Sequence, residues 1–280
     1  MKKIQFYIVL VMGMFFSLSC STVKFAYNQA DWLIVRGVTK AICLNDEQEE
    51  KLEQEVDNLL AWHRKNELPR YVAQMRIIAD SLEKGVLDRT TFDNAEVFLK
   101  ETQKRTISAV RPFALELAMT MSPEQLDCSC KRYEEKREDR EEDLNLPLSE
   151  YKEKRTKAIR KQMKRWLGSV TDEQEKMIVT MISPQSDAKK NDAISLKKRK
   201  MIHEILKGQN SDEKRAKIEA LFANFEAGLT ADEVAFRKQL GEKFKENLWK
   251  FSQTLTAEQR KELAKTLRGY AEDLEELSKE

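Results

Sequence analysis

Apolar residues recur every three or four positions through most of this chain, which is the spacing of one face of an α-helix. Charged residues fill most of the positions between them. Capping residues and glycines mark where the helices begin and end. The pattern predicts helices near residues 28–42, 46–84, 89–119, 123–143, 149–167, 172–182, 186–207, 212–227, 231–253 and 257–278.

Three apolar stripes mark the helix faces expected to pack against other helices. They are Leu52, Val56, Leu59, Leu60 and His63; Phe236, Leu240, Phe244, Leu248, Phe251 and Leu255; and Leu263, Leu267, Tyr270, Leu274 and Leu277. The third stripe alternates by four and three, as in a coiled-coil seam. We expect these stripes to form a core between antiparallel helices rather than a cofactor or ligand channel.

Five segments share one helix-start pattern: an apolar residue, a capping residue, a variable residue, an acid, and Gln or Glu. They are Leu44–Gln48, Met121–Gln125, Val170–Gln174, Leu229–Glu233 and Leu255–Gln259. The capping side chain can accept a hydrogen bond from a backbone N–H, and the Gln or Glu can bond back to the cap. Their spacing is unequal, which argues against a solenoid of equal repeats.

The composition supports a purely helical protein. Of 280 residues, 35% are charged and 41% hydrophobic, whereas only 8 are glycine and 5 proline. Such a composition favours long helices over sheets, which need closely spaced turns. We predict an all-α, elongated multi-helix bundle. The stretch Leu144–Pro147 interrupts charged helical sequence, so it divides an N-terminal helical region, 20–144, from a C-terminal one, 149–280.

The first 19 residues resemble a bacterial lipoprotein signal peptide. Lys2 and Lys3 precede an apolar run, Ile4–Phe16, that is too short to span a membrane, and small residues then lead to Cys20. The resemblance implies removal of residues 1–19 and lipidation of Cys20, with an acyl group such as palmitate. Ser21, rather than Asp, follows the cysteine, which by resemblance to enterobacterial sorting favours the outer membrane. Removing both lysines from 50 basic and 48 acidic residues leaves a neutral chain.

Three further cysteines, Cys43, Cys128 and Cys130, would meet an oxidising compartment after export. We expect Cys43 to pair with one of the other two, because a bridge between Cys128 and Cys130 would close a strained loop. Burial of all three as small apolar residues is the alternative. The cysteine spacing and the two histidines do not suit a zinc site, and we predict neither a metal nor a cofactor.

Two resemblances to known families bear on function. The segment Leu255–Gln259 is similar to the Leu-Thr-x-x-Gln repeat of Spy- and CpxP-type periplasmic proteins, which are chaperone or stress-sensing modules. A second resemblance, to an uncharacterised family of helical bacterial envelope lipoproteins without assigned activity, is concentrated before residue 75. It rests on Tyr27-Asn28, Asp31-Trp32-Leu33, Leu44–Gln48, Trp62-His63-Arg64, Glu67-Leu68-Pro69 and Tyr71.

The segment from Trp62 to Tyr71 is the best local candidate for a binding surface. It combines aromatic, cationic and hydrogen-bonding groups beside Pro69, which should bend the helix. The candidate residues are Trp62, His63, Arg64, Glu67, Arg70 and Tyr71. The same residues could instead pack together at a helix junction, with His63 and Glu67 one turn apart.

Two basic stretches suggest anionic partners. Between Lys152 and Arg165 there are eight basic residues and one acid, which could contact anionic lipid or pair with the acidic stretch Glu134–Asp143. The run Lys197-Lys198-Arg199-Lys200 would suggest nucleic acid in a cytoplasmic protein, but an exported protein would rarely meet it. We therefore predict membrane contact through the lipid, an envelope protein partner, and no nucleic acid.

No phosphate-binding loop, nucleophile elbow or zinc-protease histidine pair occurs in the sequence. The sequence favours a lipid-anchored periplasmic binding or chaperone-like protein without catalytic activity. A structural scaffold of an envelope complex and a hydrolase are the alternatives. A ligand is not identified by any motif.

Overall fold

The computed structural model describes residues 21–209 and 211–280, which form helices joined by short turns and no strand. The expected all-α bundle is confirmed. The helices are α2 Ser21–Tyr27, α3 Ala30–Ile42, α4 Asp46–Asn66, α5 Leu68–Lys84, α6 Arg89–Thr120, α7 Pro123–Asn145, α8 Leu148–Leu167, α9 Asp172–Met181, α10 Gln185–Lys207, α11 Ser211–Ala223, α12 Ala231–Ser252 and α13 Ala257–Leu277.

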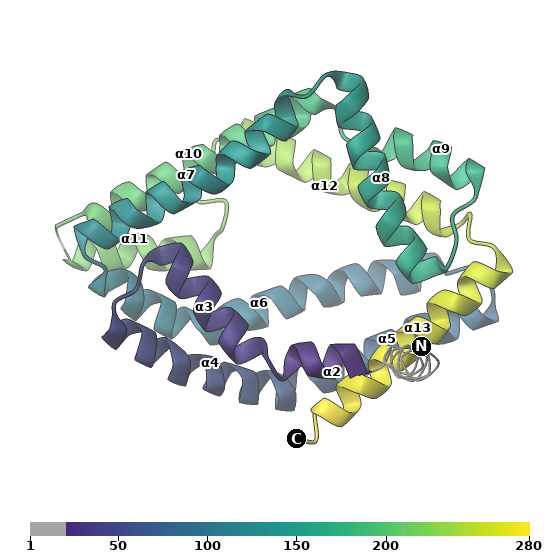
Figure 1. Ribbon diagram of the computed structural model, residues 1–280, viewed down its shortest axis with the longest axis horizontal. Helices are drawn as coiled ribbons and strands as arrows, with labels where there is room; N and C mark the ends of the chain where they lie inside the picture. The colour runs from purple at the N-terminus through teal and green to yellow at the C-terminus, as the bar shows by residue number, and fades with distance from the viewer. Residues whose placement is uncertain (1–20, 210) are drawn as a thin grey trace, which may run out of the picture.

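The helices outline a frame in Figure 1. Helices α4 and α6 run along its lower side, and α7 and α10 lie side by side on the upper left. On the right, α8 and α9 contact each other, and α13 packs along α5. The first and last parts of the described chain therefore meet, because α13 contacts both α2 and α5.

The core consists of three clusters rather than one. The largest joins buried residues of α5, α8, α9, α12 and α13, including Leu82, Ile178 and Phe251. A second lies between α5 and α13, and a third between α3 and α4. The predicted stripe of α13 is confirmed as a packing face, whereas Phe244 of the α12 stripe is 65% exposed and lies outside the core.

All five predicted helix starts are confirmed. At each start, the side chain of the capping residue accepts a hydrogen bond from the backbone N–H three residues later, and the Gln or Glu at that position accepts one from the backbone N–H of the capping residue. These reciprocal bonds form a capping box, and the capping residues are Asn45, Ser122, Thr171, Thr230 and Thr256. The expected helix 46–84 is instead two helices that meet at Glu67. Helix α2 was not predicted, and the expected helix 212–227 ends at Ala223.

Four of these boxes meet in pairs, which the sequence did not reveal. The side-chain amides of Gln174 and Gln259, each 1% exposed, exchange two hydrogen bonds of 2.8 Å and join the starts of α9 and α13. Gln48 and Gln125 join the starts of α4 and α7 in the same way. The glutamines therefore cap their own helices and also connect distant ones.

We expect Thr256→Ala to lower the free energy of unfolding by about 0.5 to 2 kcal/mol, because it removes the oxygen that caps α13. Lys265→Ala, on the exposed side of the same helix, should change it by less than about 0.5 kcal/mol. Denaturant titration of both variants measures the difference. Equal effects would contradict the capping role.

Candidate functional site

The predicted segment from Trp62 to Tyr71 forms the junction between α4 and α5. Pro69 lies in the first turn of α5, where its missing N–H costs no hydrogen bond. The backbone bonds continue across the junction, since the N–H of Glu67 donates to the His63 carbonyl and the N–H of Tyr71 to the Glu67 carbonyl. Helical hydrogen bonds therefore run through the bend between the two helices, which we call the α4–α5 corner.

Glu67 is fully buried at this corner and is held by Arg105 of α6. Arg105 donates from Nε and Nη2 to the two carboxylate oxygens at 2.7 and 3.0 Å, and also from Nη2 to Thr102 at 3.0 Å. A bidentate pair of this kind fixes the angle as well as the distance between its partners. Glu67 thus joins the α4–α5 corner to α6 and is not part of an exposed surface.

His63 lies between Tyr27 of α2 and Tyr71, which belongs to the same predicted segment. Its Nδ1 is 2.9 Å from the Tyr27 hydroxyl, and its Nε2 is 3.3 Å from the Tyr71 hydroxyl. The Tyr27 ring stacks on the imidazole, and the Tyr71 ring meets it edge-on. The histidine therefore ties α2 to the corner.

The remaining candidate residues have separate positions. Arg64 lies over the Tyr27 ring, with 5.4 Å between its Cζ and the ring centroid, and donates to the Asn28 side chain at 3.4 Å. Arg70 is exposed and donates to the Asn66 carbonyl. Trp62 turns toward α3 and α6, where it lines a cavity. Most of the segment is thus engaged in holding the corner together.

Burial lowers the pKa of His63 below its ordinary value of 6.5, and the smaller effect of the Glu67 charge opposes this. The unfolded chain therefore takes up the proton more readily, so the free energy of unfolding should be largest above about pH 6.5 and should decline as the pH falls toward the folded pKa. An NMR titration of the ring, assigned with His63→Gln, measures this pKa. A value at or above 6.5 would contradict the burial argument.

The cavity beside Trp62 is the most extensive apolar site near the predicted segment. It has a volume of about 600 Å³ and lies between α3, α4 and α6. Its walls are aliphatic and aromatic, with Glu55 and Asn58 as the polar residues; the apolar lining includes Val38, Leu59, Trp62, Val110, Phe113 and Met121. The size falls within the range of small-molecule binding sites, and the lining suits a hydrocarbon.

Small residues of α6 leave the room for this cavity. Ala109, Ala114 and Ala118 lie on the face that α6 turns toward α3 and α4, alongside Phe113 and Leu117. Sequence reasoning treated α6 only as a helix and missed this wall. The alternation of alanines with large apolar residues over 109–121 is the signal that could have found it.

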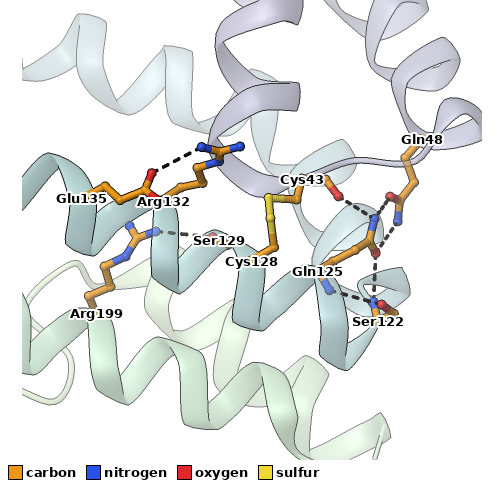
Figure 2. The surroundings of a disulfide bond; sticks show 9 residues. All are labelled: Cys43, Gln48, Ser122, Gln125, Cys128, Ser129, Arg132, Glu135 and Arg199. Carbon is orange, nitrogen blue, oxygen red and sulfur yellow. Dashed lines mark hydrogen bonds and ion pairs between the residues drawn. A yellow bond between two sulfur atoms is a disulfide. The ribbon is translucent and has the colours of Figure 1, made fainter.

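A disulfide fixes one end of the cavity (Figure 2). Cys43 follows Ile42 of the cavity wall and is bonded to Cys128 of α7, while Cys130 is unpaired. Beside the bridge, the Gln125 side chain donates to the Cys43 carbonyl at 3.0 Å and to the Gln48 side chain. Helices α3, α4 and α7 are thereby held at one point.

Some of the basic residues of α8, between Lys152 and Arg165, form ion pairs with acidic neighbours. Lys154 pairs with Asp143, and Arg160 pairs with Glu175 at 2.8 Å. Trp166, which follows the stretch, meets the Tyr270 ring edge-on at 5.3 Å between centroids. These contacts favour an intramolecular role for this part of α8.

Within residues 21–209 and 211–280, no cluster of three or more His, Cys, Asp or Glu residues could hold a metal ion. None of the helices there combines the length and the apolar character needed to cross a membrane. Cys20 and the signal segment lie outside the described residues.

Comparison with known proteins identifies the family. Neither a curated protein nor a solved structure matches the chain. The family described as "Family of unknown function (DUF6279)" matches residues 40–227, which is more than half of the 280 residues. The matched region contains the disulfide and the α4–α5 corner. The chain therefore belongs to the DUF6279 family.

Proposed function

We propose that this protein is a non-catalytic binding protein of the bacterial envelope that holds an acyl chain in the cavity between α3, α4 and α6. The observation that carries the proposal is the 600 Å³ cavity with almost wholly apolar walls. A hydrocarbon chain loses no hydrogen bonds on entering such a site and removes its surface from water. The polar groups of the nearby corner are occupied in structural contacts, which supports binding without catalysis.

The proposal places the protein on the periplasmic face of the outer membrane. It is supported by the signal-like sequence before Cys20 and by Ser21 after it. We expect residues 1–19 to be removed and Cys20 to carry acyl groups. Intact-mass analysis of the membrane fraction would show both changes; a product that begins elsewhere, without acyl mass, would contradict the anchor.

The acyl chain is preferred to an apolar polypeptide segment as the occupant. Three helices form the cavity walls, and an extended polypeptide segment would bring backbone polar groups that these mainly apolar walls cannot satisfy. The similarity of Leu255–Gln259 to Spy- and CpxP-type proteins would instead favour a chaperone-like protein. If an apolar peptide displaced a long-chain alcohol bound in the cavity, that result would support the chaperone-like function.

Quenching of Trp62 fluorescence tests acyl binding directly. A bromine-substituted long-chain alcohol should quench the purified full chain saturably, and Trp62→Phe should remove that component from the signal. Ala114→Trp should abolish the binding, because the new side chain fills the cavity. Ser108→Trp adds the same bulk on an exposed position of α6 and should leave binding intact. Equal quenching in both tryptophan variants would refute the site.

A further inference from the structure

A second cavity lies next to the apolar one, between α7, α10 and α12. It has a volume of about 460 Å³. Ile42 and Met121 line both cavities and therefore form the partition between them. Met121 is unbranched and flexible, so it can repack without disturbing the helices. One elongated molecule could in this way occupy both spaces.

The second cavity differs from the first in carrying three strong cations. Lys198 and Arg199 come from α10, in the basic run identified in the sequence, and Arg237 comes from α12. Leu126 of α7 and Ile202 and Leu206 of α10 form apolar walls beside them. A cavity with these walls suits a ligand that is anionic at one end.

The two arginines have hydroxyl partners instead of carboxylates. Arg199 donates to Ser129 at 3.4 Å, as Figure 2 shows, and stacks 4.0 Å from the Tyr133 ring centroid. Arg237 donates to Ser195 at 2.9 Å. The Nε atoms of both are shielded from solvent without a hydrogen-bond partner in the described part of the chain.

The positive charge of the cavity is only weakly offset by nearby carboxylates. Within residues 21–209 and 211–280, no carboxylate lies within ion-pair distance of Lys198, Arg199 or Arg237; the neighbouring Lys197, by contrast, pairs with Glu233 at 2.8 Å. Burial, followed by the Arg237 charge, lowers the pKa of Lys198, and the smaller effect of the Glu226 carboxylate opposes this. Lys198, Arg199 and Arg237 are half-buried, and an anion would supply the charged partner that each of them lacks.

We propose that this cationic cavity binds the phosphate group of an amphiphile whose hydrocarbon chain occupies the apolar cavity. Guanidinium groups match the geometry of phosphate oxygens and bind them through charge-assisted hydrogen bonds. The inference rests on the proposed function, since the chain must occupy the first cavity. It identifies the ligand class as phosphate-bearing lipids rather than neutral ones.

The test compares the brominated alcohol with the same chain carrying a phosphate, each below its micelle concentration, by quenching of Trp62. We expect the alkyl phosphate to bind about 10-fold or more tightly than the alcohol. Arg199→Gln and Arg237→Gln should each reduce this preference by about 10-fold and leave alcohol binding unchanged. Arg132→Gln, on exposed α7 surface beside the disulfide, is the matched control and should retain the preference.

The outcomes separate this inference from the proposed function. Loss of all quenching, by alcohol and phosphate alike, would overturn the acyl-binding function itself. Alcohol binding with no preference for phosphate, or a preference that survives both arginine variants, would overturn only the headgroup site. Inorganic phosphate is the third probe; if it displaces the alkyl phosphate at equal concentration, the site serves free phosphate and the amphiphile is excluded. Thermal unfolding of each variant confirms that it is folded.

Discussion

Replacing Arg105 by alanine is expected to lower the free energy of unfolding by about 3 to 5 kcal/mol, because it leaves the buried Glu67 carboxylate without its partner. The loss comes mainly from an uncompensated charge and not from the missing attraction. Urea titration at pH 7 measures it. The α4–α5 corner and α6 should lose hydrogen-exchange protection together, since the pair connects them.

Removing both charges of the pair tests whether charge or packing causes this loss of stability. The double variant Glu67→Gln/Arg105→Gln should recover part of the stability lost in Arg105→Ala, because no charge then remains buried. Arg132→Ala removes an ion pair with Glu135 in which both side chains are 48% exposed. It should lower the free energy of unfolding by less than about 1 kcal/mol. A double variant as unstable as the single one would show that packing, and not charge, dominates.

Removal of the disulfide is the other large expected effect. The bridge joins residues 85 positions apart, and its loss should lower the free energy of unfolding by about 2 to 5 kcal/mol. Cys43→Ser/Cys128→Ser should also weaken binding of the brominated alcohol, because Ile42 of the cavity wall adjoins the bridge. Denaturant titration and Trp62 quenching measure the two effects.

A reductant provides the control for the disulfide prediction. It should destabilise the wild-type protein by a similar amount and leave the double serine variant unchanged. The single variant Cys130→Ser alters the unpaired thiol and should keep its sensitivity to reductant. A wild-type protein indifferent to reductant would contradict the role of the bridge.

Local signals made most of the helices predictable. The caps at Ser122, Thr171 and Thr256 depend only on residues three positions apart, so their sequence is sufficient to place the helix starts. The split at Glu67 was less visible. Pro69 predicts a bend, but the contact that holds the corner on α6, between Glu67 and Arg105, joins residues 38 positions apart.

The sites depended on contacts that no local pattern encodes. Sequence favoured the segment around His63 because its residue types resemble those of interfaces, yet the ring that stacks on His63 is Tyr27 of α2, 36 residues earlier. The apolar cavity requires α3, α4 and α6 to meet around alanines of α6. Likewise, Arg199 becomes part of a cationic cavity only because Arg237 of a later helix lines the same space.

The packing of α13 on α5 sets the order in which the molecule can mature. Arg268 of α13 bonds to Glu83 of α5, 185 residues earlier, and Leu274 and Leu277 cover Leu68 and Val72. Contacts so distant in sequence form late, because a long loop must close first. The part of α5 around Leu68 and Val72 therefore stays partly uncovered until α13 has been made. Until residues 257–277 have been made, the growing protein presents an apolar surface at Leu68 and Val72, of the kind that chaperones protect from aggregation.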